Sequence, residues 1–447
     1  MRPVIARIYD REEKMESPDF DLTNPDCFVQ GDPHVLFREL RRQEPLSQIV
    51  NRHGQKYWAV VKYRDAIAVY RDPQTFSSEA PISISDNLAF SEGRGKMLIL
   101  TDSPRHLKLR KLFKWSFTPL AVMRWEATMR QLARRIFAEA AAMGDCDFVP
   151  DVAGKLPITV VCQMLGVPEA DRPRIERLGN LSVGGHDPEI QQAPADATAE
   201  TLEANAVRVQ NQAHQELAEY FGAMIARRRA QPKDDLLSMI ANEKIDGAVM
   251  SEEEALYNCV LVLDAGLDTT RNALSGGVYA LLNNRNELER LVANPELVPS
   301  AVEEIVRWTS PSFHNIRRVT RTTSLRGMEL SEGDLVAVWL GSANRDEEIF
   351  DEPDRFDVSR DPNEHLGFGH AQHFCLGANL ARLELRVALR ELLPYLKNIE
   401  LTGRIERLRH CSVPGIKHMP VRFSREGAES TRIDMPAASI ISKRASR

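Results

Sequence analysis

The sequence lacks any closely spaced pair of cysteines. It has six cysteines in 447 residues and no C-x-x-C motif. Six cysteines scattered through a long chain argue against a disulfide framework or a structural zinc site and fit a reducing compartment. The cysteines are Cys27, Cys146, Cys162, Cys259, Cys375 and Cys411.

Long apolar runs are also missing. No stretch of eighteen apolar residues occurs, whereas a helix needs about 20 of them to cross a bilayer. The N-terminal segment MRPVIARIYDREEKMESPDF is charged and has no apolar core of a secretory signal. We therefore expect a cytoplasmic protein without a membrane anchor.

An excess of positive charge is absent as well. The net charge is −6 and the sequence pI is about 6.1, so nothing indicates binding to nucleic acid or to an anionic membrane. With 43% hydrophobic residues the chain can bury a large core. It contains neither internal repeats nor low-complexity tracts, and we expect a soluble globular protein.

Hydrophobic periodicity predicts a mainly α-helical protein with small β-sheets. The central helix is predicted from Ser251 and Glu254, an S-x-x-E capping box before an apolar stretch that reaches about Asn284. A period near two, with a turn at Gly333, predicts short strands over residues 316–338. Other helices are predicted at residues 35–42, 123–143 and 298–308 and from Leu376 onward. A further helix is predicted after Ser103-Pro104, with Ser103 as its cap. A strand is predicted at residues 57–61 and a loop at residues 184–198.

We expect one large domain over residues 31–424. Residues 1–30 are polar and loosely patterned, and they are predicted to be an N-terminal extension whose order the pattern leaves open. Residues 425–447 have no clear period and are predicted to be a flexible C-terminal tail.

The segment from residue 365 to residue 385 holds the most informative cysteine. Cys375 stands just before a predicted helix, after a loop rich in Gly and His. The positive end of the helix dipole and unpaired backbone N–H groups favour a thiolate there, and a thiolate is a good ligand for a soft metal. This loop alone leaves three interpretations open: a buried cysteine that acts as a small hydrophobe, a catalytic nucleophile with His373 as its base, and an axial ligand of haem iron.

Four residues of this loop form a spaced pattern, namely Phe368, His373, Cys375 and Gly377. The pattern resembles the haem-binding signature of the cytochrome P-450 family. One position departs from it, because Ala371 stands where the family has a glycine. Glycine tolerates a positive φ and alanine does not do so freely. Either the loop geometry shifts here, or this position does not need a positive φ.

A second pattern lies upstream of this loop. Glu304 and Arg307 form an E-x-x-R motif whose side chains share one helix face, and the segment FDEPDRF contains Arg355. Both resemble family motifs, in which the second arginine completes a buried Glu-Arg-Arg cluster. The resemblance implies that Glu304, Arg307 and Arg355 stabilise the fold around the haem pocket. Without it, the pair would be an ordinary surface ion pair.

A third pattern, Ala265-Gly266-Leu267-Asp268-Thr269, lies within the predicted central helix. It resembles the oxygen-activation motif of the same family. A threonine hydroxyl can bond to the carbonyl four residues back, and with the glycine it could open a local groove for dioxygen. The resemblance implies that Thr269 holds peroxide and a water, and that Asp268 relays protons. The alternative is a helix-interior threonine beside a solvated aspartate.

Four basic residues stand where the family binds the haem propionates. His106 and Arg110 form an H-x-x-x-R motif on one helix face, and Arg317 follows further along the chain. His373 takes the place of a more usual arginine. The resemblance implies that all four bind the cofactor, whereas each residue alone would be an ordinary solvated base.

The resemblance covers about residues 32–423. It implies a haem-thiolate monooxygenase of the cytochrome P-450 fold, with haem b between the long central helix and the Cys375 loop. Such an enzyme inserts one atom of dioxygen into an apolar substrate, here a terpenoid, a sterol side chain or a fatty-acid-like molecule. The alternatives are a natural-product tailoring hydroxylase or epoxidase of the same family, and a non-catalytic haem carrier or sensor.

The resemblance also implies partners. The length leaves no room for a flavin or iron–sulfur domain, so electrons should come from a ferredoxin and its ferredoxin reductase. Such ferredoxins are acidic, and Arg110, Lys111 and Lys114 are expected to form a basic patch that receives one. Leu263, Leu267 and the turn at residues 311–316 are expected to line an apolar pocket.

Overall fold

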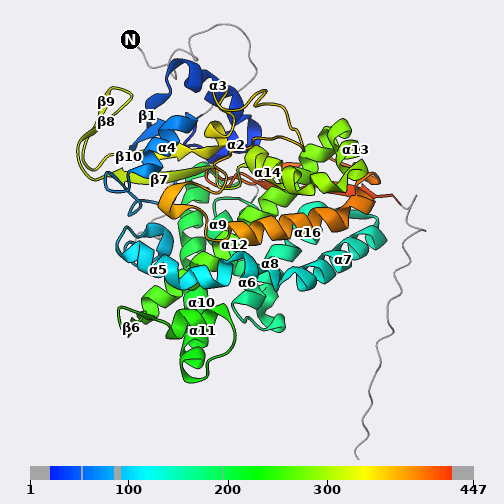
Figure 1. The fold of residues 1–447 in the computed structure, drawn as a ribbon, viewed down its shortest axis with the longest axis horizontal. Helices are drawn as coiled ribbons and strands as arrows, with labels where there is room; N and C mark the ends of the chain where they lie inside the picture. Colours follow the sequence, from blue (N-terminus) through cyan, green and yellow to red (C-terminus); the bar gives the residue numbers. More distant parts are fainter. Residues whose placement is uncertain (1–20, 52–53, 85–91, 195, 425–447) are drawn as a thin grey trace, which may run out of the picture.

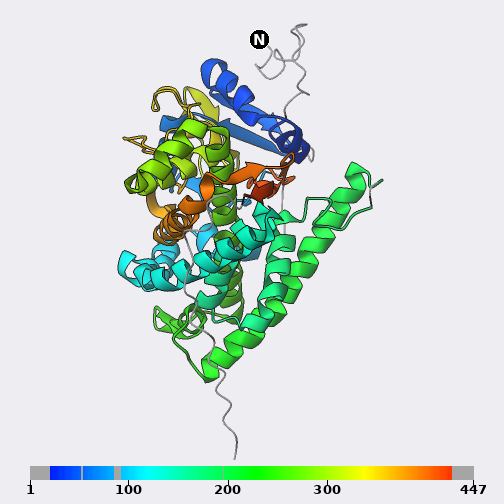
Figure 2. The same cartoon turned by 90° about the vertical axis from the view of Figure 1, so that its right-hand side faces the viewer.

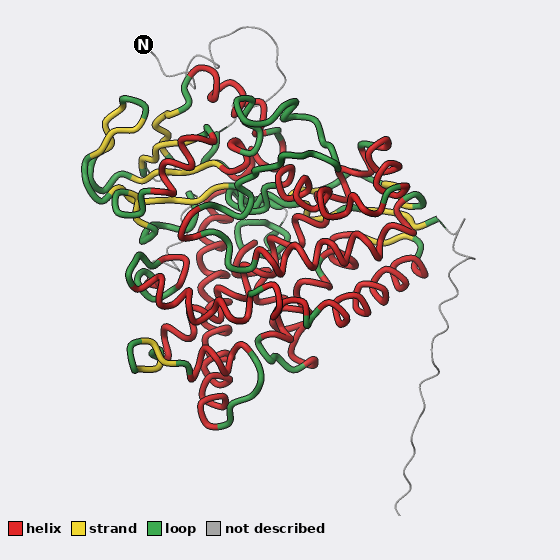
Figure 3. Tube along the Cα trace, in the orientation of Figure 1, coloured by secondary structure: helices red, strands yellow, loops and turns green. Residues whose placement is uncertain are grey.

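The structure, a computed structural model, describes residues 21–424 except residues 52–53, 85–91 and 195. Helices make up most of the described chain, and the larger strands gather at one side (Figure 1, Figure 3). This mainly helical architecture with small sheets confirms the predicted fold class. The predicted tail at 425–447 and the first twenty residues of the predicted extension lie outside the described residues.

A five-stranded sheet forms the β-rich side. Its strand order is β1-β2-β10-β7-β3, with β10 parallel to β2 and the other pairs antiparallel. The apolar sequence LVAVW makes β10 a strand that is buried along its whole length. The strands are β1 (Leu46–Val50), β2 (Lys56–Val60), β3 (Phe76–Ser77), β7 (His314–Val319) and β10 (Leu335–Trp339), and the helices nearby are α2 (Pro25–Gln30), α3 (Pro33–Gln43) and α4 (Tyr63–Arg71).

The packed domain begins before residue 31. Phe28 of α2 is buried, and its ring centroid lies 5.9 Å from that of Phe313 and 6.4 Å from that of Trp339. Phe37 of α3 packs against the same tryptophan. Because these aromatic contacts bury α2 in the core, the domain boundary predicted at residue 31 lies too late in the chain.

Helix α12 (Glu252–Asn283) runs through the centre of the helical part (Figure 1, Figure 2). The predicted capping box is present: the Ser251 hydroxyl accepts the Glu254 N–H at 3.0 Å, and the Glu254 carboxylate accepts the Ser251 N–H at 3.0 Å. Acidic side chains in the first turn complement the helix dipole. The helix packs against α8 (Lys155–Met164), α9 (Arg172–Gly184), α10 (Ala199–Ala230), α14 (Val298–Thr309) and α16 (Ala378–Leu396).

The remaining elements surround this core. The helices are α5 (Arg105–Lys114), α6 (Pro119–Met123), α7 (Glu126–Met143), α11 (Leu236–Asn242), α13 (Arg285–Ala293) and α15 (Leu340–Ala343). Small sheets pair β11 (Ile399–Leu401) with β14 (Pro420–Phe423) and β4 (Asp145–Asp147), β12 (Glu406–Arg407) with β13 (Ile416–His418), β5 (Lys244–Ile245) with β6 (Ala248–Val249), and β8 (Thr323–Leu325) with β9 (Met328–Leu330). No helix in the described part of the chain is both long and apolar enough to cross a membrane.

The predicted helices and strands are present, with their ends shifted by a few residues. The predicted cap of α5 is wrong. Pro104 occupies the N-cap position without a side-chain hydrogen bond, and the Ser103 hydroxyl instead donates to Gln372 at 2.8 Å. A tertiary contact with the loop before Cys375 has therefore displaced the local capping interaction.

Glu304 and Arg307 form a fully buried ion pair, in which Nε and Nη2 of Arg307 lie 2.7 and 2.8 Å from the two carboxylate oxygens. The prediction that the Arg355 side chain completes the cluster is wrong. That side chain is 53% exposed and pairs with Glu352, whereas Nε of Arg360 lies 3.2 Å from the Glu304 carboxylate. The carbonyl of Arg355 accepts hydrogen bonds from both Arg307 and Arg360, so this residue contributes its backbone to the cluster.

Replacing Arg360→Gln should therefore lower the free energy of unfolding far more than Arg355→Gln. The first change removes a charge beside buried Glu304 and hydrogen bonds to the carbonyls of Asp351, Glu352 and Arg355, at a cost of about 2–4 kcal/mol. The second change removes a solvent-exposed ion pair. Guanidinium chloride denaturation measures both variants, and equal losses would contradict the assignment of Arg360.

Candidate functional site

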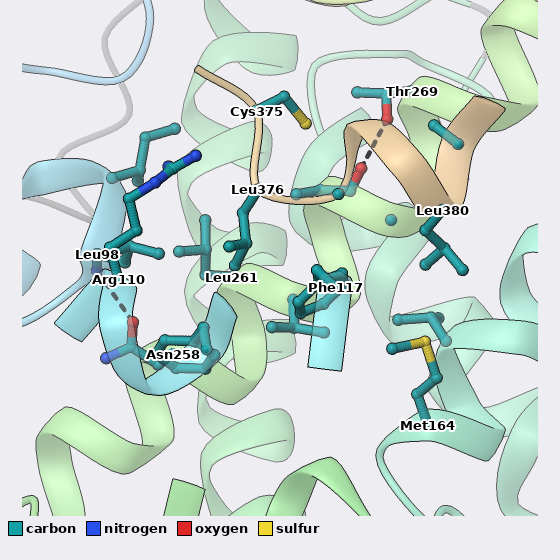
Figure 4. Close-up of a pocket in the computed structure, with 18 of the residues that line it drawn as sticks. Leu98, Arg110, Phe117, Met164, Asn258, Leu261, Thr269, Cys375, Leu376 and Leu380 are labelled. Atoms are coloured by element: carbon teal, nitrogen blue, oxygen red, sulfur yellow. Dashed lines mark hydrogen bonds between the residues drawn. The ribbon is translucent and has the colours of Figure 1, made fainter. Parts of the chain in front are cut away.

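A cavity lies between α12 and the segment that carries Cys375 (Figure 4). About 1000 Å³ of empty space lies within it, the open solvent at its mouth included. Leu261, Ala265 and Thr269 line it from α12 at intervals of four residues, because such residues share one helix face. The other walls are mostly apolar and include Leu98, Phe113, Phe117, Val161, Met164, Leu376 and Leu380.

Two leucines predicted to line the pocket face away from this cavity. Leu263 and Leu267 are fully buried against α9, where a Cβ atom on Gly179 would lie 2.9 Å from Leu267 and 3.9 Å from Leu263. They stand two positions after Leu261 and Ala265, which turns them to the other side of α12, toward the neighbouring helix. Residues 311–316 do not line the cavity either.

Cys375 presents its sulfur to the cavity, in the turn before α16 (Figure 4). Its N–H donates to the carbonyl of Phe368 at 2.8 Å and closes the loop. Enclosure by the surrounding protein raises the pKa of the thiol, while a backbone hydrogen bond from Gly377 and the charges of Arg110 and Arg382 lower it. These three groups would stabilise a thiolate.

Phe368 and Gly377 of the predicted loop lie next to Cys375 in the folded loop. The buried ring of Phe368 lies under the guanidinium of Arg382, with 4.4 Å between the guanidinium carbon and the ring centroid. A Cβ atom on Gly377 would lie 4.0 Å from the Cys375 sulfur. The structure therefore brings Phe368, Cys375 and Gly377 together, as the motif predicted.

The loop keeps a left-handed residue at the position where the motif departs from the family. Ala371 has a φ of 56° and Gly369 a φ of 68°. Position 371 therefore does adopt a positive φ, which excludes the alternative in which it does not need one. Alanine is strained in this conformation, because its Cβ approaches the following carbonyl oxygen.

Three of the four predicted basic side chains line the cavity that holds the sulfur, and the charge of the fourth, Arg317, acts on His106 and His373. His106, Arg110 and His373 line the cavity, and the His106 and His373 rings stack with centroids 4.0 Å apart. Burial, together with the charges of Arg110 and Arg317, lowers the pKa of His106 to about 4 and that of His373 to about 2. Burial also lowers the pKa of Arg317. Burial therefore disfavours the positively charged forms of these side chains.

The unsatisfied nitrogens of this cluster fit the propionates of a haem. Both ring nitrogens of His106 and Nε2 of His373 are buried without a hydrogen-bond partner among the described residues. Leaving such a group unpaired costs about 1–3 kcal/mol, and a carboxylate would satisfy it with a charge-assisted hydrogen bond. A cysteine sulfur, apolar walls and unpaired basic groups in one cavity form the donor set that a haem requires.

Thr269 and Asp268 point to different sides of α12. The Thr269 hydroxyl lies in the cavity wall and donates to the Ala265 carbonyl at 2.7 Å (Figure 4). Asp268 is buried on the α9 side, where its carboxylate bonds to Arg271, which also donates to Asn180 at 2.7 Å. Burial raises the pKa of Asp268, and the Arg271 charge opposes that rise. Only Thr269 of the two lines the cavity.

Helix α12 is continuous from Glu252 to Asn283, so the chain has no break at Gly266, which itself lines the cavity. A Cβ atom on Gly266 would lie 3.2 Å from a methyl carbon of Val161. The glycine therefore allows α8 to approach α12 closely, and the Thr269 hydroxyl bond leaves the helix unbroken.

Glu384 lines the cavity and was missed in the sequence. It is buried on α16, and its Oε2 has no hydrogen-bond partner in the described part of the chain. Burial raises its pKa to about 8, so its neutral form predominates near neutral pH. A carboxylate four residues after Leu380, on an otherwise apolar helix face, was the signal that could have found it.

Comparison with known proteins gives consistent matches over most of the chain. The family model for cytochrome P-450 matches residues 28–400. The methyl-branched lipid omega-hydroxylase of Mycobacterium tuberculosis is 38% identical over 400 residues, 87% of this chain and 90% of that protein. The steroid C26-monooxygenase of Mycolicibacterium smegmatis is 34% identical over 414 residues, 92% of this chain and 98% of that protein.

Solved structures also match. A Mycobacterium marinum cytochrome P-450 in complex with pseudoionone superposes with a TM-score of 0.83 at 31% identity, covering 92% of this chain and 100% of that chain. Sequence and structure comparisons therefore agree over both the helical part and the β-rich side.

Replacing Ala371→Gly should raise the free energy of unfolding by about 0.5–1 kcal/mol. Relief of the left-handed strain contributes about 1–2 kcal/mol, and the greater freedom of glycine in the unfolded chain offsets about 0.4–1 kcal/mol of it. Ala138→Gly, on the exposed face of α7, is the matched control and should lower stability by about 1 kcal/mol. Chemical denaturation measures both, and a loss of stability in Ala371→Gly would mean that position 371 is unstrained.

Proposed function

The chain belongs to the cytochrome P-450 family of monooxygenases, and from this premise we propose that it uses haem b to insert one atom of dioxygen into an apolar molecule. The observation that carries this proposal is the cavity that joins the Cys375 sulfur to unpaired imidazole nitrogens. In the proposed complex Cys375 ligates the iron. The residues proposed to bind the propionates are His106, Arg110, Arg317 and His373.

When bound, haem supplies the activation of dioxygen, aided by electron density from a thiolate ligand. The residues of the chain supply position and protons. Because the Thr269 hydrogen is engaged by the Ala265 carbonyl, the free lone pairs of its oxygen can accept a hydrogen bond from a proton donor in the cavity. Asp268 is proposed to deliver protons from the α9 side after it releases Arg271.

The substrate is proposed to be a branched lipid, a sterol side chain or a terpenoid. The aromatic and aliphatic walls of the cavity exclude water and favour an apolar molecule. The names of the relatives support this class, since one is a methyl-branched lipid omega-hydroxylase and another a steroid C26-monooxygenase. The solved relative holds pseudoionone.

Electrons are proposed to come from an acidic ferredoxin reduced by its ferredoxin reductase. Arg110, expected in the basic patch, lines the cavity instead. Lys111 and Lys114 lie on the exposed face of α5, and Trp115 and Leu120 next to them are 73% and 78% exposed. An exposed apolar surface rimmed by positive charge is typical of a docking site for an acidic protein. The inner face of the same helix lines the cavity, which shortens the path for electrons.

Two substitutions separate iron ligation from proton handling. Cys375→Ser should abolish the red-shifted Soret band of the reduced carbon monoxide complex that thiolate ligation produces.

Thr269→Ala should keep that band, lower the amount of product formed per NAD(P)H by about tenfold and release more hydrogen peroxide. Thr309→Ala is the matched control, since its hydroxyl makes the same 2.7 Å bond to a carbonyl four residues back, away from the cavity. A thiolate-type band in Cys375→Ser, or unchanged coupling in Thr269→Ala, would contradict these roles.

The docking surface is tested by charge reversal. Lys114→Glu should raise the KM for ferredoxin about fivefold or more, with a weaker dependence on salt, while peroxide-driven turnover stays unchanged. Lys233→Glu, another exposed lysine located before α11, is the control. Equal KM values for the two variants in ferredoxin-driven assays would remove Lys114 from the proposed interface.

A further inference from the structure

The connector between α9 and α10, residues 185–198 apart from residue 195, is bound by polar and charged groups from the C-terminal part of the chain. Arg409 donates its backbone N–H to the Asp187 carboxylate at 3.2 Å. The Lys417 ammonium lies 3.0 Å from Asp187 and 2.8 Å from Glu189. Because Asp187 is buried, its pairing with Lys417 fixes the start of the connector against β13. Figure 2 shows α10, which the connector leads into, along one side of the molecule.

His418, the next residue of β13, bridges two carboxylates from different segments. Its Nδ1 contacts Asp147 of β4, and its Nε2 lies 2.8 Å from the Glu189 carboxylate on the connector. The other charged groups nearby are Lys417 on the same strand and Asp187 on the connector. The Asp151 carboxylate accepts the Asp147 N–H. The Glu406 carboxylate, on β12, lies within 4.8 Å of a ring nitrogen of His418 and of the Glu189 carboxylate.

The connector also forms one wall of a groove between α9 and α10. This groove holds about 1260 Å³ of empty space, its open mouth included, and residues 189–192 line it. Asn180 lines it from α9 and accepts the 2.7 Å hydrogen bond from Arg271, the guanidinium that holds Asp268. The groove therefore leads from solvent to the polar pair behind the cavity.

We propose that His418 is a pH-responsive latch on this connector. The charged imidazolium joins Asp147 to Glu189 and holds the connector against β4 and β13, and the neutral imidazole weakens that hold. Weakening it loosens the wall of the groove and opens the approach of water to Asn180. The consequence for proton delivery through Asp268 rests on the proposed function, whereas the latch does not.

The direction of the pH effect follows from the surroundings of His418. Burial lowers its pKa, but hydrogen bonds and charges from Asp147 and Glu189 outweigh burial, so the pKa is raised above 6.5. A histidine whose pKa is raised in the folded state stabilises that state, and this contribution is fully present at a pH below the pKa of the unfolded chain. It is lost as the pH rises through the pKa of the folded state. Lys417 stays charged over this range, because its carboxylate partners outweigh its burial and raise its pKa. The connector therefore loosens in part rather than detaching.

Hydrogen–deuterium exchange of the haem-loaded full-length protein tests the latch. Protection of residues 185–198, corrected for the intrinsic pH dependence of exchange, should fall about three- to tenfold between about pH 6 and about pH 9, while α13 stays unchanged. His418→Asn cannot become charged and should show low protection at both pH values. His418→Lys, which remains charged, should retain protection at the higher pH.

Arg422→Gln is the matched control, since Arg422 pairs with Asp145 on the sheet that contains β4, and connector protection should follow the wild type. Equal wild-type protection at both pH values would overturn the latch. So would wild-type protection at the lower pH in His418→Asn, or a loss of protection at the higher pH in His418→Lys equal to that in wild type. Exchange needs no turnover, so failure of the proposed monooxygenase function would leave this result standing.

Discussion

The unpaired basic groups around the cavity are the constraint on which the rest of the structure depends. The buried ring of His106 stacks on that of His373, and both ring nitrogens of His106 and Nε2 of His373 find no partner among the described residues. Selection for folding alone would pair such groups with carboxylates or replace them with apolar residues. An anionic ligand resolves this conflict. The sulfur of Cys375 in the same cavity indicates that the ligand also carries a metal, and membership of the cytochrome P-450 family identifies it as haem.

The surrounding framework keeps this unfavourable arrangement in place. Glu304, Arg307 and Arg360 fix the chain upstream of the cysteine loop through buried charge pairs and hydrogen bonds to backbone carbonyls. The capped start of α12 places one face of that helix against the cavity. With these supports, the loop can hold Ala371 in a left-handed conformation that its side chain disfavours.

Helix α12 separates two kinds of chemistry on its two sides. Thr269 faces the cavity, whereas Asp268 faces α9 and is tied to Arg271. Protons proposed to reach the cavity must therefore come from the side where α9, α10 and their connector meet solvent. The pairing of Lys417 and His418 with that connector links the charge state of a distant strand to the same region. The fold thus places a mostly apolar cavity and a polar, titratable surface on two sides of one helix.

The sequence by itself determined the features that depend on neighbours within a turn or two of the chain. These are the capping box of α12, the pairing of Glu304 with Arg307, the loop that presents Cys375 and the class of protein that these motifs indicate together. Only the tertiary structure decided the others: that Arg360 rather than Arg355 reaches Glu304, that Leu263 and Leu267 face α9, that the His106 and His373 rings stack, and that His418 joins Asp147 to Glu189. Such contacts join segments far apart in the chain, and their geometry is set by packing, which no local periodicity records.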